Sequence, residues 1–129
     1  MDTLRIDDAG AVRTITLNRP EVRNAMNRAM LSELVQALEA ANLDQDVRCV
    51  VLTGEGPVFC AGGDIKDLFT DTNPVTIRHM LSQRIRPMAR ALFTMDKPVH
   101  PCSTAPSPVP GWRCRWPRTW CWPAARRAS

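Results

Sequence analysis

In the first half of the chain, apolar positions change from a period of two to a period of three to four. Thr3–Asp7 and Val12–Leu17 alternate apolar with polar side chains, which is typical of half-buried strands. The turn residues Asp8–Gly10 lie between them and predict a hairpin. A helix follows, with Asn24 or Asn27 as its capping residue. Its buried face is predicted from apolar residues at three- and four-residue steps: Met30, Leu31, Leu34, Leu38 and Ala41.

The next apolar run, Cys49–Leu52, predicts a buried strand. Strand, helix and strand in this order indicate a right-handed βαβ unit in a layered α/β domain. Further on, Asn73 and Pro74 predict a helix start, and Pro87 predicts a kink or a restart within that helix. The sequence after Asp96–Val99 predicts no further strand. The helical stripe consists of Ile77, Met80, Leu81, Ile85, Met88, Leu92 and Phe93.

Small residues are concentrated between Gly56 and Lys66, directly after the buried strand. Glycine and alanine leave backbone N–H groups uncovered, and a helix start adds further free donors with positive potential. Such a corner can hold an anion or a developing oxyanion. A plain tight turn needs only one glycine, so this series indicates a functional loop.

Charge and composition divide the chain near Val99. Twelve basic and all thirteen acidic residues precede residue 100, whereas five arginines and no acidic residue follow it. All four tryptophans and six of the eleven prolines also lie in the last thirty residues. We therefore expect an ordered region, residues 1–99, and an aberrant Pro/Arg/Trp-rich tail, residues 100–129, that is irregular or disordered.

The cysteine count and the N-terminal residues favour a cytoplasmic protein. The five cysteines are an odd number, and Met1–Arg5 lacks the apolar core of a signal peptide, so we expect reduced thiols. Cys49 and Cys60 have apolar neighbours and are expected to pack as small core residues. No apolar stretch is long enough to span a membrane.

The order of these motifs resembles the crotonase superfamily, the enoyl-CoA hydratase and isomerase family. After the hairpin come Leu17–Met26, then the helix, then Val50–Gly54, Phe59–Lys66 and Asp96–Val99. Each motif alone is weak, but order and spacing agree over residues 3–99. The resemblance implies the N-terminal part of a truncated crotonase-like spiral of ββα repeats. It also implies fatty acid metabolism, with either hydratase (lyase) or isomerase chemistry on acyl-CoA thioesters.

The resemblance also implies a site. The backbone N–H of Gly63 is the expected catalytic donor to the thioester oxygen of an acyl-CoA, as one half of an oxyanion hole. A second donor comes from a later glycine-rich turn, and removal of one such donor typically costs about 3 kcal/mol of transition-state stabilisation. The substrate-binding residues that it implies are Val22, Arg23, Ala25, Ala61, Gly62, Gly63, Asp64 and Ile65.

Three charged residues near this site keep two interpretations. Arg23 either binds a CoA phosphate, which suits its bidentate guanidinium, or lies on a solvated surface. Asp64 either accepts backbone N–H groups at a helix start or contacts the ligand. Lys66 either meets a phosphate or is solvated.

The resemblance places the acid and base of classical hydratases, two glutamates, on segments beyond Val99, and the chain encodes neither. We therefore expect a chain with little or no activity. CoA is part of the substrate, so no cofactor and no metal are expected. The family forms homotrimers and hexamers through later helices, which makes such assembly doubtful for this chain. The partner expected is the acyl-CoA substrate, with no membrane and no nucleic acid.

From His100 onward the sequence departs from the family pattern, which continues into an Asn-Gly-Pro segment and a Gly-Ala-Gly turn. A reading frame that starts at the third base of each codon from Cys102 recovers both with GC-rich codons. We therefore expect residues 100–129 to be frameshifted, and resequencing of the DNA tests this. The alternative function is a non-catalytic remnant or partner-binding module. Less favoured is a nucleic-acid-binding tail, on its interleaved arginines and tryptophans.

Overall fold

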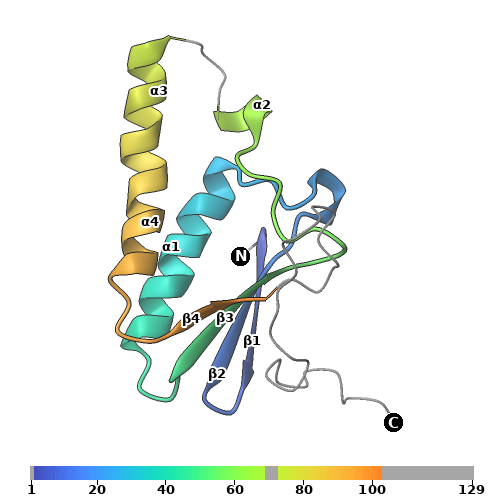
Figure 1. The fold of residues 1–129 in the computed structure, drawn as a ribbon, viewed down its shortest axis with the longest axis vertical. Helices are drawn as coiled ribbons and strands as arrows, with labels where there is room; N and C mark the ends of the chain where they lie inside the picture. Colours follow the sequence, from blue (N-terminus) through green and yellow to red (C-terminus); the bar gives the residue numbers. More distant parts are fainter. Residues whose placement is uncertain (1, 69–72, 103–129) are drawn as a thin grey trace, which may run out of the picture.

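A computed structural model describes residues 2–68 and 73–102 of the chain. Four strands form one sheet in the order β1-β2-β3-β4, and helices lie along it (Figure 1). The predicted irregular tail from residue 103 and the frameshift lie outside the described residues. The elements are β1 (Leu4–Ala9), β2 (Val12–Leu17), η1 (Pro20–Val22), α1 (Arg28–Leu43), β3 (Cys49–Gly54), α2 (Ile65–Leu68), α3 (Pro74–Met80), the π-helical turn η2 (Leu81–Ile85), α4 (Arg86–Phe93) and β4 (Val99–Pro101).

The hairpin and the βαβ unit form as predicted. β1 and β2 are antiparallel and joined at Gly10, whose φ of +59° suits glycine. β2 and β3 are parallel neighbours connected through α1, with Ile15 opposite Leu52. The alternating side chains Ile15, Leu17, Val50 and Leu52 are buried, and they share a core with the apolar face of α1. The apolar side chains that recur every two residues in the strands therefore pack against those that recur every three to four residues in α1.

The helical segment after Pro74 restarts before Pro87, as predicted. A π-helical turn separates α3 from α4, and Pro87 lies in the first turn of α4. Proline has no N–H to give to the preceding turn, and a wider turn accommodates this loss. Met80, Met88 and Leu92 of the predicted stripe lie against the core, whereas Phe93 is 90% exposed. The prediction for Phe93 is therefore wrong, because the helix ends there and turns its last residue outward. The side chain of Leu81, which also belongs to the predicted stripe, is not among those described.

A short strand forms where the sequence analysis predicted none. β4 pairs in parallel with β3, with Val50 opposite Val99. The Val50 N–H donates to the Pro98 carbonyl at 3.0 Å, and the Cys102 N–H donates to the Leu52 carbonyl at 2.9 Å. Backbone pairing with the open edge of β3 needs few specific side chains, so the prolines at positions 98 and 101 did not prevent it. The strand crosses the predicted boundary between residues 99 and 100.

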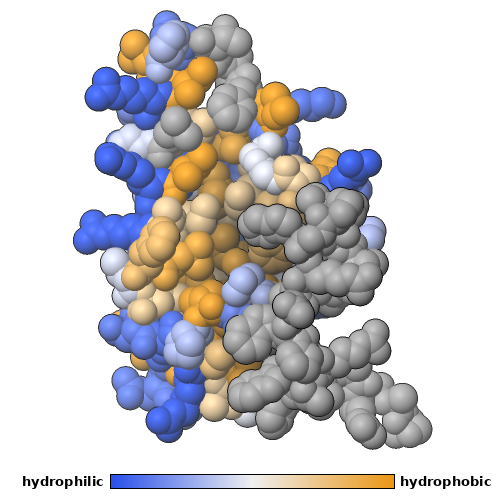
Figure 2. All heavy atoms as spheres, viewed as in Figure 1, coloured by the Kyte–Doolittle hydropathy of each residue, from blue (hydrophilic) through white to orange (hydrophobic). Residues whose placement is uncertain are grey.

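The helix α1 lies against the sheet, η2 and α4 lie beside α1, and α3 extends past the N-terminal end of α1 (Figure 1). Apolar residues gather between the helices, and hydrophilic side chains project from the outer side of α3 and α4 (Figure 2). Neither α1 nor any other helix within residues 2–68 and 73–102 has the length and apolarity that a bilayer crossing needs. The N-terminus of α1 points to the loops that follow β2 and β3, where the predicted site residues lie.

Candidate functional site

Two loops that are far apart in sequence run side by side beyond the ends of β2 and β3. The Ala61 N–H donates to the Arg23 carbonyl at 3.0 Å, and the Met26 N–H donates to the Gly62 carbonyl at 2.8 Å. The Asp64 N–H then donates to the Met26 carbonyl at 2.9 Å. These bonds form a parallel bridge between Met26 and Gly63. The two predicted segments, residues 22–25 and 61–65, are therefore held together by backbone pairing.

The N–H of Gly63 takes no part in this bridge. In a parallel bridge the bonds from Met26 go to the residues on either side of its partner, here Gly62 and Asp64. Within residues 2–68 and 73–102, the Gly63 N–H makes no hydrogen bond, and Gly63 is exposed. The predicted donor is thus an uncommitted backbone N–H on a loop whose neighbours are fixed.

The first loop contains a left-handed pair that is stabilised by a buried asparagine. Arg23 and Asn24 have φ values of 55° and 56°, a region that costs most L-residues about 1 kcal/mol or more. The Asn24 side chain is fully buried, and its Oδ1 accepts from the Arg19 N–H at 2.9 Å. Its Nδ2 donates to the carbonyls of Glu55 and Val58 at 2.9 and 2.7 Å. Asn24 therefore connects the first loop to the chain that leaves β3.

The second loop depends on two glycines. A Cβ on Gly54 would lie 2.3 Å from the Phe59 carbonyl oxygen and 2.8 Å from Asn24 Nδ2. Gly62 has a φ of +103°, which L side chains rarely adopt. Cys60 lies between them, half-buried against the core, and its thiol donates to the Asn24 carbonyl at 3.2 Å. The small residues predicted to leave the backbone uncovered are thus also required by the close approach of the two loops.

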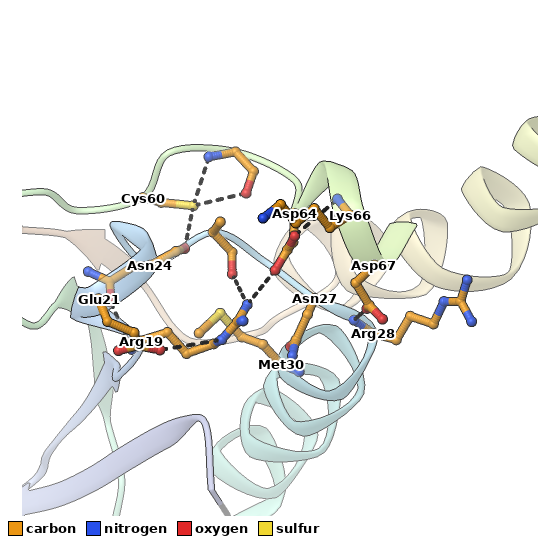
Figure 3. A network of polar contacts seen from close by, with 12 residues as sticks. Arg19, Glu21, Asn24, Asn27, Arg28, Met30, Cys60, Asp64, Lys66 and Asp67 are labelled. Atoms are coloured by element: carbon orange, nitrogen blue, oxygen red, sulfur yellow. Dashed lines mark hydrogen bonds and ion pairs between the residues drawn. The ribbon is translucent and has the colours of Figure 1, made fainter. Parts of the chain in front are cut away.

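An ion pair lies across the two loops (Figure 3). The Arg19 Nη1 donates to the Asp64 Oδ2 at 3.0 Å and to the Ala25 carbonyl at 2.7 Å. The hydrogen bond and charge of Arg19, together with backbone N–H groups, hold the pKa of Asp64 below its ordinary value. Asp64 Oδ1 also accepts from the Lys66 N–H at 3.2 Å, the helix-start interaction that was one of its two predicted roles.

Side chains from both loops also fix the start of α1 (Figure 3). Asn27 is the capping residue, since its Oδ1 accepts from the Met30 N–H at 2.8 Å. Asp67 of α2 accepts from the Arg28 N–H at 2.7 Å. A carboxylate and an amide oxygen at the first turn satisfy donors that the helix leaves free. The loop that carries Gly63 is therefore anchored to a long helix as well as to the sheet.

A cavity of about 600 Å³ opens between the loops. Six of the eight predicted substrate-binding residues line it, and the other two, Arg23 and Gly62, lie in the loops beside it. Arg23 is exposed, and its guanidinium forms no ion pair with any described residue. The lining consists of Arg19, Val22, Ala25, Ala61, Gly63, Asp64, Ile65, Lys66 and Asp67.

A larger hollow of about 720 Å³ lies between α1 and α4 and contains none of the predicted site residues. Arg86 and Arg90 line it beside Glu39. Its walls are helix surface, where backbone N–H groups are already bonded within the helices. The smaller cavity is therefore the better candidate for recognition by backbone donors.

Comparison with known proteins identifies the family. A sequence profile described as "Enoyl-CoA hydratase/isomerase" matches residues 7–100, which run from within β1 into β4 and include both loops of the cavity. The chain belongs to the enoyl-CoA hydratase/isomerase family. The crotonase resemblance of the sequence is thus confirmed for the N-terminal part of the fold.

Individual members of the enoyl-CoA hydratase/isomerase family agree with this assignment. A 1,2-epoxyphenylacetyl-CoA isomerase of Escherichia coli K12 is 41% identical over 90 residues, which are 68% of this chain and 34% of the isomerase. A probable enoyl-CoA hydratase of Rhodobacter capsulatus is 36% identical over 97 residues, 75% of this chain and 36% of that protein. The chain therefore spans about a third of the length of these relatives.

The crystal structure of an enoyl-CoA hydratase from Bacillus anthracis superposes with a TM-score of 0.73 at 31% sequence identity. The match covers 80% of this chain and 40% of the hydratase. The described residues thus have the N-terminal architecture of the family, and the mixed α/β fold predicted from the sequence is confirmed.

The sequence analysis missed the place of three residues in this site, Arg19, Asn24 and Asp67. Arg19 stood only within the family motif, and Asn24 was considered only as an alternative helix cap. One signal for Asn24 was available, because asparagine tolerates left-handed backbone and can satisfy neighbouring backbone groups. No local signal pairs Arg19 with Asp64, which lies 45 residues away.

Proposed function

We propose that the cavity binds the thioester group of an acyl-CoA and that the Gly63 N–H donates to its carbonyl oxygen. Support comes from one observation above all. The loop bridge uses the carbonyl of Gly62 and the N–H of Asp64, and it leaves the Gly63 N–H uncommitted at the cavity wall. A preorganised donor of this kind stabilises the negative charge of an enolate-like oxyanion.

Other groups around the cavity fit a CoA ester. Val22, Ala25 and Ala61 offer small apolar contacts for the pantetheine chain. Arg23 and Lys66 carry positive charge at or beside the opening, where CoA phosphates need it. Asp64 acts mainly on the loop, because Arg19 and the Lys66 N–H occupy its carboxylate.

In this function, residues 1–129 supply binding and carbonyl polarisation. Hydration or isomerisation also needs a second oxyanion donor and acid–base groups. The family resemblance places these groups beyond Val99, and the family's assembly into trimers and hexamers depends on the same later segments. We therefore propose that residues 1–129 alone bind without turnover, and that the reaction class belongs to the enoyl-CoA hydratases and isomerases.

Calorimetric titration of the 129-residue protein with crotonyl-CoA and with CoA tests this proposal. We expect saturable binding of both, tighter binding of crotonyl-CoA, and a constant absorbance of its conjugated thioester. Gly63→Pro removes the N–H, and its affinity for crotonyl-CoA should fall to that for CoA; Gly63→Ala retains the N–H and is the matched variant. Equal binding of the two ligands by the unsubstituted protein would contradict a carbonyl donor, and no binding at all would support a misfolded fragment.

A further inference from the structure

We infer that Arg19 is the positioning residue of this site: it fixes the loop that carries Gly63 against the loop that carries Ala25. This inference rests on the proposed function, because it names the group that sets the direction of the proposed donor. Arg19 donates from one nitrogen to both loops, at 2.7 Å to the Ala25 carbonyl and at 3.0 Å to Asp64. Asp64 directly follows Gly63, so this contact acts next to the donor.

The surroundings of Arg19 show that it is committed to the protein. Its side chain is 18% exposed and that of Asp64 is 16% exposed, so both charges lie largely out of water. The Arg19 Nε also lies 4.0 Å from a Glu21 carboxylate oxygen. Two carboxylates thus compensate the charge of Arg19, whereas the exposed Arg23 has no carboxylate partner among the described residues and is the better candidate for a CoA phosphate.

The backbone of Arg19 reinforces the same arrangement. Its N–H donates to Asn24 Oδ1 at 2.9 Å, and its carbonyl accepts from the Asn24 N–H at 2.8 Å. The backbone of Arg19 therefore holds Asn24, and with it the left-handed pair at residues 23 and 24, in place. Arg19 lies two residues after the end of β2, so its side chain connects the end of this strand to the second loop (Figure 3).

The positive charge of Arg19 also has an electrostatic consequence. The carboxylate of Asp64 lies beside the residue whose N–H is proposed to meet a developing negative charge. Left unpaired, this carboxylate would oppose that charge, and Arg19 compensates it at 3.0 Å. Arg19 thus favours the proposed donor by geometry and by charge without touching the ligand's carbonyl.

Three variants test the inference on the full 129-residue chain. Arg19→Gln removes the charge, and Arg19→Lys keeps the charge but replaces the planar guanidinium by a compact ammonium on a different stem. Arg13→Gln is the matched control, since Arg13 is 14% exposed and donates to Asp8 and Asp44 at 2.8–2.9 Å. Arg13 lies at the other end of β2, outside the lining of the cavity.

The first measurement is hydrogen exchange at the amides of Met26, Ala61 and Asp64, which report the loop bridge. In Arg19→Gln we expect their exchange to accelerate about tenfold more than that of the β2 and β3 amides, as expected for a charge-assisted hydrogen bond. Arg19→Lys should be intermediate, and Arg13→Gln should change no amide of the bridge selectively. Equal acceleration of bridge and sheet amides in Arg19→Gln would reduce Arg19 to a general stabilising residue and overturn the inference.

The second measurement is the carbonyl stretch of crotonyl-CoA labelled with ¹³C at the thioester carbon. Hydrogen bonding lowers this frequency in the bound ligand, and we expect Arg19→Gln to lose most of the shift together with three- to tenfold in affinity. Arg13→Gln should retain both. A retained shift in Arg19→Gln would overturn the inference. Absence of a shift in the unsubstituted protein would instead count against the proposed function, and the exchange experiment would still decide the role of Arg19.

Discussion

Replacing Asn24 by alanine should destabilise the protein far more than its short polar side chain suggests. The side chain is fully buried and makes three hydrogen bonds to backbone groups of Arg19, Glu55 and Val58. A buried partner that loses its hydrogen bond costs about 1–3 kcal/mol. Some of these groups regain water when the side chain is removed, so we expect a loss of about 3 kcal/mol in the free energy of unfolding, at the upper end of ordinary substitutions.

Asn27→Ala provides the comparison, because Asn27 makes one capping bond at the start of α1. Its loss should cost about 1 kcal/mol. Urea unfolding monitored by circular dichroism gives the free energy of unfolding of both variants, and an unchanged m-value shows that the variants differ in stability alone. Asn24→Asp extends the test, since it keeps the acceptor for the Arg19 N–H but loses the donors to Glu55 and Val58. If Asn24→Ala and Asn24→Asp both unfold within about 0.5 kcal/mol of Asn27→Ala, the argument from buried hydrogen bonds is wrong.

Three further predictions follow from burial, close approach and charge. Leu38→Ala should lower the free energy of unfolding by about 3 kcal/mol in urea titration, because Leu38 is 0% exposed. Leu43 is 79% exposed, so Leu43→Ala should change this free energy by less than about 0.5 kcal/mol. Gly54→Ala should lower the thermal midpoint and disturb the loop bridge in amide exchange, because its Cβ would lie 2.3 Å from a carbonyl oxygen; an unchanged midpoint would refute the close approach. Arg13 lowers the pKa of Asp8 from its ordinary value of 3.8, so the ion pair stabilises the fold above that pH and loses this effect as the pH falls below it. The urea midpoint of Arg13→Gln should therefore vary less between pH 5 and pH 2 than that of the unsubstituted protein.

Local periodicity was sufficient to predict the elements around the core. Ile15 and Leu17 alternate with polar neighbours in β2, and Leu34 and Leu38 recur at helical spacing in α1, so each pattern specifies which face becomes buried. Phe93 shows the limit of the same argument. It continues the apolar stripe in sequence, but the helix ends at this residue and no neighbouring element covers it among the described residues. A stripe predicts a buried face only where a partner surface continues beside it.

The strand β4 shows a second limit, which concerns backbone groups. Pairing of Val99–Pro101 with β3 depends on an open strand edge and on the Pro98 and Leu52 carbonyls as acceptors. Neither requirement appears in the local alternation of side chains. A segment of three residues that ends in proline can therefore pair where no periodic pattern predicts a strand.

Both loops of the candidate site follow from the family motifs, but the contacts that hold them do not. Side chains 45 residues apart, Arg19 and Asp64, meet only after β2, α1 and β3 have assembled. This dependence has a consequence for function. The described hydrogen bonds that join residues 60–67 to other segments are made with residues 19–28, which lie in the N-terminal part of the fold. A donor held entirely by this part is preorganised before any ligand arrives, so the cost of ordering the loop has already been met in folding. Under the proposed function, binding of an acyl-CoA carbonyl therefore requires the β2–α1–β3 unit and its two loops, whereas turnover requires groups outside them.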